Sequence, residues 1–337
     1  MHVVIRADGG RKIGYGHLVR TGALAAEFLR RGHRVTYATT TSEQIDDLCP
    51  RAVETRCLPS RTDPSAFVTW IRDSDVDVAV IDSYLADVDY QRAVRNQTRL
   101  VVFSDDTRHT MCADVVVNGN LYAPDLEYEF VGDDPTWLLG PDYVPLRKEI
   151  ATLADQAPPW RDQSKRAIIT MGGSDVANAT PAAVEAFDGT QLRVDVVVGP
   201  AFSNEAEIQA TAEQITAETE VVHNPSNLPA LMFDADLAVG ACGSTTYELL
   251  ALGTPLICSP VAENQHRIAS ALSERDIAAV VDETRRKRGF RRSVERYVSD
   301  ARIRRQHRDR GRSIVDGHGI ERVCNKIYSL TEQDMTT

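Results

Sequence analysis

Three glycine-containing loops hold the residues of this sequence that are best suited to chemistry, and each loop follows a short apolar segment. The first leads from Arg6-Ala7-Asp8 to His17, the second is residues 172–175 (Gly-Gly-Ser-Asp), and the third is residues 241–248 (Ala-Cys-Gly-Ser-Thr-Thr-Tyr-Glu). Glycines allow backbone N–H groups to approach an oxyanion closely, and the first turn of a helix attracts anions. Loops of this type indicate a phosphate-bearing ligand, although each can also be a plain turn.

In the first loop, Gly14 and Gly16 precede His17, which we expect at the start of a helix. A helix N-terminus disfavours an imidazolium cation, so we expect His17 to be neutral and able to accept a proton. The alternative is that Gly14 and Gly16 make a tight turn and that His17 caps the helix. The spacing of these residues does not decide between the two interpretations.

In the second loop, Gly172 and Gly173 can bring the backbone close to a phosphate or simply form a turn. The third loop offers hydroxyl and N–H groups to a diphosphate at a predicted helix start, and Glu248 could accept both ribose hydroxyls. The residues with those hydroxyl groups are Ser244, Thr245 and Thr246. The competing interpretation is structural, because Thr245-x-x-Glu248 has the spacing of a capping box, which needs no ligand.

These loops belong to a regular alternation of apolar strands and amphipathic helices. In the first half of the chain, strands are predicted near residues 2–6, 34–38, 77–82, 100–104 and 114–118. In the second half they are predicted near residues 166–171, 193–198, 221–223, 237–240 and 255–259. The clearest helices are predicted over residues 17–31, 245–252, 265–275 and 320–330. Repeated βα units predict parallel sheets, whose ligands bind at the carboxyl ends of the strands.

The alternation breaks at Ala157-Pro158-Pro159-Trp160, where paired prolines exclude helix and favour an extended linker. We therefore predict an α/β protein of two Rossmann-like domains, whose parallel sheets face each other across a cleft. The N-terminal domain is predicted over residues 1–155 and the C-terminal domain over residues 160–315. The last helix, within residues 316–332, is expected to pack back on the N-terminal domain.

Composition narrows the class of protein. The chain has 337 residues, of which 42% are hydrophobic and 26% charged, which is enough for two cores. Its net charge of -11 argues against sequence-independent nucleic-acid binding, and the basic run at residues 285–292 is expected on a solvated helix face. Five lysines among 38 basic residues, with a larger number of acidic residues, suggest a halophilic composition. With no apolar segment of about 20 residues and no signal-peptide pattern, we expect a cytoplasmic protein that does not bind membranes.

The six cysteines form no CxxC pair, so we expect buried thiols rather than a zinc site or a disulfide framework. They are Cys49, Cys57, Cys112, Cys242, Cys258 and Cys324. No Asp/His cluster has clear metal-ligand spacing. We therefore expect no metal and no cofactor.

Considered together over roughly residues 1–275, the motifs of this sequence are similar to those of a known family. The chain resembles the PseG/SpsG-like UDP-sugar hydrolases of the pseudaminic-acid pathway and, more broadly, the two-Rossmann (GT-B) nucleotide-sugar glycosyltransferases. Nine motifs occur in the order of that family: Arg6-Ala7-Asp8, Gly14-x-Gly16-His17-x-x-Arg20, Asp82-x-Tyr84, Asp105-Asp106, Asn118-x-Asn120, Gly140-Pro141-x-Tyr143-x-x-Leu146-Arg147, Gly172-Gly173-Ser174-Asp175, Gly243-x-Thr245-Thr246-x-Glu248 and Asn264-Gln265.

The resemblance implies a metal-independent hydrolase. Its substrate would be a UDP-2,4-diacetamido-2,4,6-trideoxyhexose of the UDP-6-deoxy-AltdiNAc type, cleaved at the anomeric C–O bond to sugar and UDP in nonulosonic acid biosynthesis. The implied partners are this small molecule and water, and we expect a monomer. The C-terminal domain would hold UDP, with Glu248 on the ribose. The implied catalytic residues are His17, which activates water, and Asp8 and Tyr84. The other implied binding residues are Gly14, Gly16, Arg20, Gly172, Gly173, Ser174, Gly243, Ser244, Thr245, Thr246, Asn264 and Gln265.

Three positions depart from the family pattern. Tyr15 is bulkier than the small hydroxyl residue expected in the glycine loop, Ser83 replaces a histidine beside Tyr84, and Glu263 replaces an aspartate before Asn264. These residues would surround the sugar, so they bear on which sugar is bound more than on the nucleotide.

Two other functions fit the same loops. A glycosyltransferase would use the same UDP site and pass the sugar to an acceptor, often a lipid, but the apolar and basic patch typical of such enzymes is not evident in the N-terminal half. A non-catalytic sugar-nucleotide binding module would tolerate the loss of His17, which is present. Release of UDP without an acceptor distinguishes the three functions.

Overall fold

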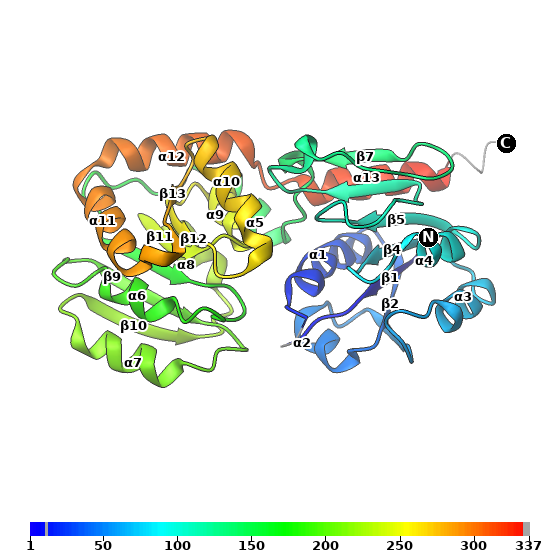
Figure 1. Ribbon diagram of the computed structural model, residues 1–337, viewed down its shortest axis with the longest axis horizontal. Coiled ribbons are helices and arrows are strands. Elements are labelled where there is room, and N and C mark those ends of the chain that lie inside the picture. Colours follow the sequence, from blue (N-terminus) through cyan, green and yellow to red (C-terminus); the bar gives the residue numbers. More distant parts are fainter. Residues whose placement is uncertain (11–12, 333–337) are drawn as a thin grey trace. The chain divides into compact units, whose positions relative to one another are not determined.

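The computed structural model describes residues 1–10 and 13–332. The chain forms two compact units, each with its own parallel sheet (Figure 1). Unit 1 is Met1–Lys148 together with the segment from His318 onward, and unit 2 is Glu149–Gly317. The division lies ahead of the paired prolines at which we expected the linker. Those prolines belong to unit 2, where Nη2 of Arg308 donates to the Pro158 carbonyl at 3.0 Å.

Unit 1 is built on a seven-stranded parallel sheet in the order β3-β2-β1-β4-β5-β6-β7. The strands are β1 (His2–Ala7), β2 (Arg34–Thr39), β3 (Glu54–Cys57), β4 (Val78–Asp82), β5 (Arg99–Phe103), β6 (Val115–Asn118) and β7 (Thr136–Leu139). The central strands are mostly apolar and are buried on both faces, as is typical of parallel sheets. Our sequence prediction missed β3 and β7. Strand β3 reads Glu-Thr-Arg-Cys and is exposed at the sheet edge, so it carries no apolar pattern, and Cys57 is exposed rather than buried as we predicted.

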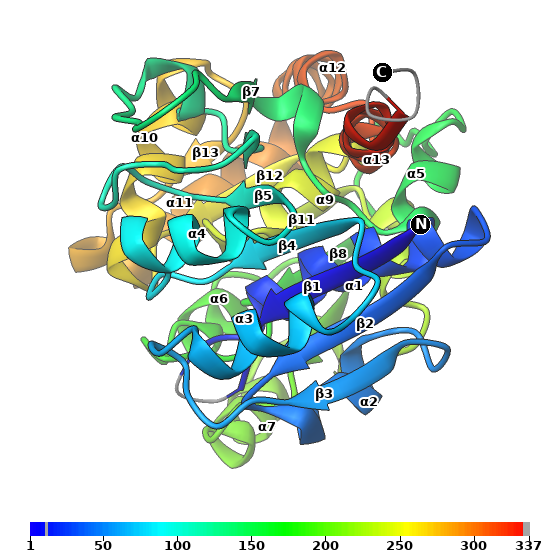
Figure 2. The same cartoon turned by 90° about the vertical axis from the view of Figure 1, so that its right-hand side faces the viewer.

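Helices cover both faces of the unit 1 sheet. They are α1 (Gly16–Arg30), α2 (Ile45–Leu48), α3 (Ser65–Arg72), α4 (Val88–Arg95) and α13 (Gly319–Glu332). One core joins the sheet to α1, α2 and α13, and the other joins it to α3 and α4. Figure 2 shows α3 and α4 in front of β1 and β4, with α1 behind them. Unit 1 is therefore a three-layer α/β/α sandwich.

Helix α13 brings the C-terminal part of the chain into the core of unit 1 (Figure 1). Val323, Cys324 and Ile327 are fully buried in the core that contains α1. The helix can begin where it does because Gly319 has no side chain, since a Cβ atom there would lie 2.2 Å from the Val144 carbonyl oxygen. The apolar residues whose spacing predicted this helix thus form one buried stripe.

Unit 2 has a six-stranded parallel sheet in the order β10-β9-β8-β11-β12-β13. Its strands are β8 (Arg166–Thr170), β9 (Arg193–Val198), β10 (Glu218–His223), β11 (Leu237–Ala241), β12 (Leu256–Ser259) and β13 (Ala279–Val280). Its helices are α5 (Lys148–Ala154), α6 (Thr180–Glu185), α7 (Glu205–Gln214), α8 (Leu228–Asp234), α9 (Thr245–Leu252), α10 (His266–Glu274), α11 (Arg286–Ser299) and α12 (Ala301–Ile314). Side chains of α6, α7 and α11 pack with the sheet in one core. The basic run lies at the start of α11, with most of its side chains exposed.

Both sheets reverse their strand order once, and the reversal determines where a ligand can bind. In unit 1 the chain winds outward from the gap between β1 and β4, and in unit 2 from the gap between β8 and β11. Loops leave opposite faces of the sheet at such a point and leave a crevice at the carboxyl ends of the two strands. No helix among the described residues is long and apolar enough to cross a membrane.

Candidate functional site

An organised polar cluster lies at the β1–β4 reversal point of unit 1, with His17 at its centre. His17 is the second residue of α1, and its Nδ1 lies 2.5 Å from Oδ1 of Asp82, the last residue of β4. The two side chains are 9% and 0% exposed. Because an ionised carboxylate only accepts hydrogen bonds, Nδ1 carries a proton, so that in a neutral ring the lone pair is on Nε2. Asp82 thus orients the imidazole and selects the tautomer that can take a proton at Nε2.

Arg20, one turn further along α1, binds two carboxylates at once. Its Nε and Nη2 donate to Oδ2 and Oδ1 of Asp82, both at 2.6 Å, and its Nη1 donates to Oδ1 of Asp105 at 2.6 Å. Burial by itself raises the pKa of Asp82, but the charge of Arg20 outweighs this effect and holds the pKa well below its usual range. The pKa of Asp105 is also lowered, again because Arg20 outweighs burial. Both carboxylates are therefore ionised at neutral pH.

Tyr84 packs against His17 at one side of the cluster. Its ring centroid lies 4.8 Å from that of His17, edge to face, and the guanidinium carbon of Arg108 lies 4.3 Å from the same ring centroid. The hydroxyl donates to Oδ2 of Asp105 at 2.7 Å. Burial and the negative charge of Asp105 raise the pKa of Tyr84 well above its usual value. At neutral pH this hydroxyl is a donor and not a base.

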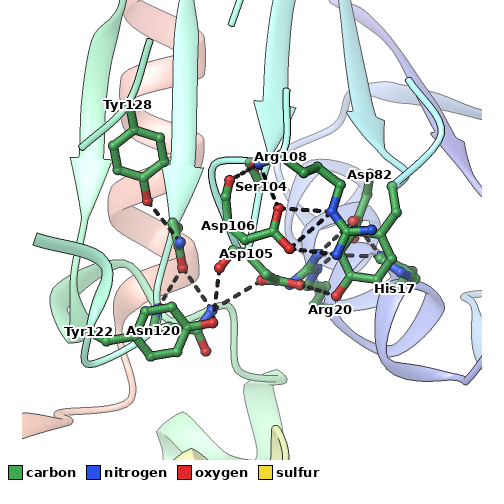
Figure 3. A network of polar contacts seen from close by, with 12 residues as sticks. His17, Arg20, Asp82, Ser104, Asp105, Asp106, Arg108, Asn120, Tyr122 and Tyr128 are labelled. Atoms are coloured by element: carbon green, nitrogen blue, oxygen red, sulfur yellow. Dashed lines mark hydrogen bonds and ion pairs between the residues drawn. The ribbon is translucent and has the colours of Figure 1, made fainter. Parts of the chain in front are cut away.

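The cluster continues across the carboxyl ends of β5 and β6, as Figure 3 shows. Nδ2 of Asn120 donates to Oδ1 of Asp105 at 3.1 Å and to Oδ1 of Asn118 at 2.7 Å. Nδ2 of Asn118 in turn donates to the Tyr128 hydroxyl at 2.9 Å. One connected set of hydrogen bonds therefore runs from His17 on α1 to the segment beyond β6.

Asp8, the other carboxylate predicted for catalysis, has different partners. Its Oδ2 pairs with Nη1 of Arg6 at 2.8 Å, and its Oδ1 accepts from the Thr39 hydroxyl and from both N–H and hydroxyl of Thr40. Burial raises the pKa of Asp8, but the charge of Arg6 and the Thr40 hydrogen bonds lower it further, so that the pKa lies below its usual value. Asp8 thus ties the end of β1 to the end of β2.

The glycines of the first loop serve its backbone conformation. Gly10 and Gly14 exchange backbone hydrogen bonds at 3.1 and 2.8 Å, and Gly14 has a positive φ of 92° that favours glycine. A Cβ atom on Gly14 or Gly16 would have no neighbour within 4 Å. Gly14 therefore satisfies the requirements of a turn, and the space beside both glycines remains open in unit 1.

In unit 2 the predicted binding loops come together through the sheet order. Strands β8, β11 and β12 are neighbours, so the loops that follow them leave the same carboxyl edge side by side. Gly172 and Gly173 pack closely against Gly199, where a Cβ atom would lie 2.5 Å from the Gly172 carbonyl oxygen. The next residues have different positions: Ser174 is half-buried, whereas Asp175 is buried and accepts from the Ala179 and Thr180 N–H groups at the start of α6.

The start of α9 contradicts the capping-box interpretation. The N-cap is Ser244, with no side-chain cap hydrogen bond, so Thr245 is already inside the helix and cannot cap it with Glu248. Ser244 is exposed and Thr245 half-buried, which leaves them accessible within unit 2. The Thr246 hydroxyl instead donates to the Ala241 carbonyl at 3.2 Å, and Glu248 is buried in the first turn.

Asn264 and Gln265 lie in a short 3-10 helix (Glu263–Gln265) beyond β12. Nε2 of Gln265 lies beside Gly243, at 3.6 Å from where a Cβ atom would be. Oε1 of Gln265 accepts from the Val261 N–H at 3.0 Å, which orients the amide. The structure thus brings Gly243 and Gln265 together, although they belong to separate loops.

Sequence reasoning placed His17 and Tyr84 in the site but gave no role to Asp82, Asp105 or Asn120, although it quoted their motifs. The signal that could have found them is positional. Each follows an apolar run at the end of a predicted parallel strand, where side chains meet at one edge of the sheet. Among the described residues, no group of three or more His, Cys, Asp or Glu side chains is arranged to hold a metal ion.

Solved structures with a similar fold define the class of fold. MurG of Acinetobacter baumannii superimposes with a TM-score of 0.70 at 14% identity, covering 97% of this chain and 99% of MurG. The calicheamicin glycosyltransferase CalG4 superimposes with a TM-score of 0.66 at 17% identity, covering 97% of each chain. At these identities the likeness concerns the fold, and it confirms the predicted GT-B architecture.

Sequence comparison refines this class. Over 346 residues the chain is 25% identical to the spore coat polysaccharide biosynthesis protein SpsG of Bacillus subtilis, covering 99% of this chain and 100% of SpsG. Over 279 residues it is 23% identical to the UDP-2,4-diacetamido-2,4,6-trideoxy-beta-L-altropyranose hydrolase of Campylobacter jejuni, covering 82% of this chain and 97% of the hydrolase. No protein-family model matches the chain. The resemblance to PseG/SpsG-like proteins of the GT-B superfamily is thereby confirmed.

Proposed function

We propose that the protein hydrolyses a UDP-linked 2,4-diacetamido-2,4,6-trideoxyhexose to the free sugar and UDP. The observation that carries this proposal is the buried pair of His17 and Asp82, whose 2.5 Å contact leaves Nε2 of the imidazole as a proton acceptor. Similarity to the Campylobacter jejuni hydrolase supports the substrate class. The position of the pair at the β1–β4 reversal point supports a role in ligand chemistry rather than in folding.

In the proposed reaction, the oxygen of a water molecule forms a bond to the anomeric carbon and gives its proton to Nε2 of His17. The anomeric C–O bond breaks, and its electron pair leaves with UDP. Because UDP is a stable anion, the reaction needs anion stabilisation more than a strong general acid. We assign that role to unit 2, where the glycines after β8 and the first turn of α9 offer N–H groups to a diphosphate. We assign the ribose to Glu248.

The remaining predicted residues take supporting roles in this proposal. Tyr84 confines the imidazole, because its hydroxyl is committed to Asp105. Asp8 holds the end of β1, from which the loop to His17 departs. We assign ligand contacts to Gln265, which lies beside Gly243, and to Asn264, the preceding residue of the same 3-10 helix.

The test is an assay of UDP release without any acceptor, using a panel of UDP-2,4-diacetamido-trideoxyhexoses. His17→Asn keeps a polar side chain but cannot take the proton, so turnover should fall by about 10²–10⁴ while binding of the UDP-sugar is nearly retained. Melting temperature and UDP-sugar affinity by calorimetry are the controls. A folded variant that hydrolyses at close to the parental rate would exclude His17 as the base. The proposal also expects the rate to be unchanged by a chelator of divalent metals.

A glycosyltransferase is the second candidate, because CalG4, a solved structure of the same fold, is a glycosyltransferase. Such an enzyme would use the same nucleotide site and transfer the sugar to an acceptor. Slow release of UDP in the acceptor-free assay, with rapid release after an acceptor is added, would favour this function. A protein that binds UDP-sugar and releases no UDP under either condition would be a binding module.

A further inference from the structure

Arg20 belongs to the His17 cluster and has no role in the proposed reaction. Sequence reasoning assigned it to substrate binding, yet its side chain is only 18% exposed. Three of its nitrogens donate to the buried carboxylate of Asp82 and the half-buried carboxylate of Asp105, each at 2.6 Å. Because Asp82 and Asp105 both bind this guanidinium, its hydrogen bonds are made within the protein rather than to a ligand.

The positive charge of Arg20 offsets the negative charge that Asp82 places beside His17. His17 lies 2.5 Å from Oδ1 of Asp82, and an unscreened buried carboxylate at that distance strongly favours an imidazolium over a neutral ring. An imidazolium has no lone pair and cannot act as a base. Nη2 of Arg20 donates to the same Oδ1 atom, and its Nε donates to Oδ2, so the guanidinium faces both oxygens of the carboxylate that orients His17.

We propose that Arg20 is a positioning residue that neutralises Asp82 and thereby keeps His17 in its neutral, proton-accepting form. Asp105 pairs with the same guanidinium, so two carboxylates share one positive charge and the cluster has one excess negative charge. Asp105 therefore favours the imidazolium form of His17, in opposition to Arg20. That this protonation state matters for turnover rests on the proposed function. The charge balance itself is a property of the cluster and can be measured without any reaction.

The charged and titratable groups around His17 come from three elements. Asp82 and Tyr84 lie at and beyond the end of β4, Arg20 lies on α1 itself, and Asp105 follows β5. Arg108, which stacks on Tyr84, forms its own ion pair with Asp106 at 2.6 Å. The Arg108–Asp106 pair adds no net charge, so among the charged side chains the protonation of His17 depends mainly on Asp82, Arg20 and Asp105.

The experiment follows the His17 ring resonances by NMR in the full chain as the pH is changed, together with the pH profile of UDP release. In Arg20→Gln, the cluster becomes more negative, so imidazolium is favoured and the titration midpoint should move to higher pH. The acid limb of the rate profile should move in the same direction. In Asp105→Asn, the cluster becomes less negative, and both readouts should move to lower pH.

Two further variants separate charge from structure. The double variant Arg20→Gln/Asp105→Asn removes one positive and one negative charge, so its midpoint should return close to that of the parent. Asp106→Asn makes the same charge change as Asp105→Asn at a carboxylate paired with Arg108 instead of Arg20, and it should move the midpoint less. A merely structural role for Arg20 predicts lower stability in these variants without opposite shifts of the midpoint.

The outcomes distinguish this inference from the proposed function. If Arg20→Gln does not fold, Asp105→Asn and the double variant decide the matter, because an unmoved midpoint in Asp105→Asn overturns the inference. Midpoints that move as expected in a protein that releases no UDP would support the charge balance and reject the hydrolase. Rapid UDP release by the parent, together with titration midpoints that do not move in the variants, would support the hydrolase and reject the charge balance.

Discussion

At the scale of single residues, two buried aspartates at the carboxyl edge of unit 1 differ in what they contact. Asp8 is bound by Arg6, Thr39 and Thr40, whereas Asp82 contacts His17. Both were visible in the sequence as residues at strand ends. Only the tertiary structure shows that Asp8 contacts the ends of β1 and β2 and that Asp82 contacts the imidazole of His17.

For Asp8, we expect substitution to lower stability more than it lowers turnover. Asp8→Asn leaves the buried guanidinium of Arg6 without its counter-charge, which should lower the free energy of unfolding by about 3–5 kcal/mol. Urea unfolding measures this change. Asp73→Asn is the control, because Asp73 pairs with Arg72 in solvent and should change stability by only about 0–1 kcal/mol. Full stability with a large loss of turnover would instead assign Asp8 to catalysis.

The carboxylates of unit 1 also predict how stability depends on pH. The folded-state pKa values of Asp8, Asp82 and Asp105 are all lowered, so these groups bind fewer protons when folded than when unfolded. Their contribution to the free energy of unfolding is therefore complete above the unfolded-state pKa of about 3.9. It is lost as the pH falls toward their folded-state pKa values. Urea unfolding at a series of pH values should show little change from these groups between about pH 7 and pH 5 and a steep loss below about pH 4. Stability that stayed constant to pH 3 would contradict the ion pairing described.

For Glu248, we expect substitution to weaken nucleotide binding more than folding. Its carboxylate does not complete a capping box, and hydrogen bonds to a charged group contribute about 1.5–3 kcal/mol, so Glu248→Ala should lower UDP affinity by about 10-fold to 150-fold in calorimetry. Thr246→Val is the matched control in the same turn. It removes a hydroxyl that donates to the Ala241 carbonyl, so it should reduce stability while leaving UDP affinity nearly unchanged. Equal affinities of the parent and Glu248→Ala for UDP would reject the ribose assignment.

At the scale of elements, α13 shows how a segment far along the chain completes a core. Its apolar residues recur at helical spacing, and the stripe they form is buried against the core that contains α1. Arg31, directly after α1, donates from Nη1 to the Asn325 side chain at 2.7 Å. Since α1 carries both His17 and Arg20, the packing of α13 helps to hold the helix that presents the cluster.

Removing one buried side chain of α13 should therefore destabilise unit 1. Ile327 is fully buried, and Ile327→Ala should lower the free energy of unfolding by about 2–5 kcal/mol through lost burial and the cavity left behind. Differential scanning calorimetry of the full chain measures the effect. Ser329→Ala on the same helix removes only a hydroxyl that donates to the Lys326 carbonyl, and it should leave the melting temperature nearly unchanged. Equal melting temperatures for the two variants would show that α13 is not part of the cooperative core.

At the scale of the whole molecule, the net charge of -11 predicts a response to salt. Screening relieves the self-repulsion of an acidic surface, so molar KCl should raise the melting temperature relative to dilute buffer. The same salt weakens exposed ion pairs such as Arg34 with Glu54, but pairs of this kind contribute little. A melting temperature that is independent of salt, or that falls with it, would contradict an adaptation to high salt.

The sequence by itself determined the class of fold. Strands such as β1 and β4 are mostly apolar, and the period of the apolar residues in α1 and α13 is helical, so local patterns were sufficient to predict parallel sheets in two halves. The same patterns failed for β3, because an exposed edge strand gains its hydrogen bonds from a neighbour and needs no apolar residues.

The partners of the site residues were decided by the tertiary structure alone. His17 and Asp82 are 65 positions apart, and they meet because β1 and β4 are neighbours in the sheet although β2 and β3 lie between them in the chain. Glu248 and Thr245 had the spacing of a capping box, yet the helix begins one residue too early for that contact. Hydrogen bonds between distant segments depend on sheet order and on the exact start of a helix, and neither is encoded in the local pattern of residue types.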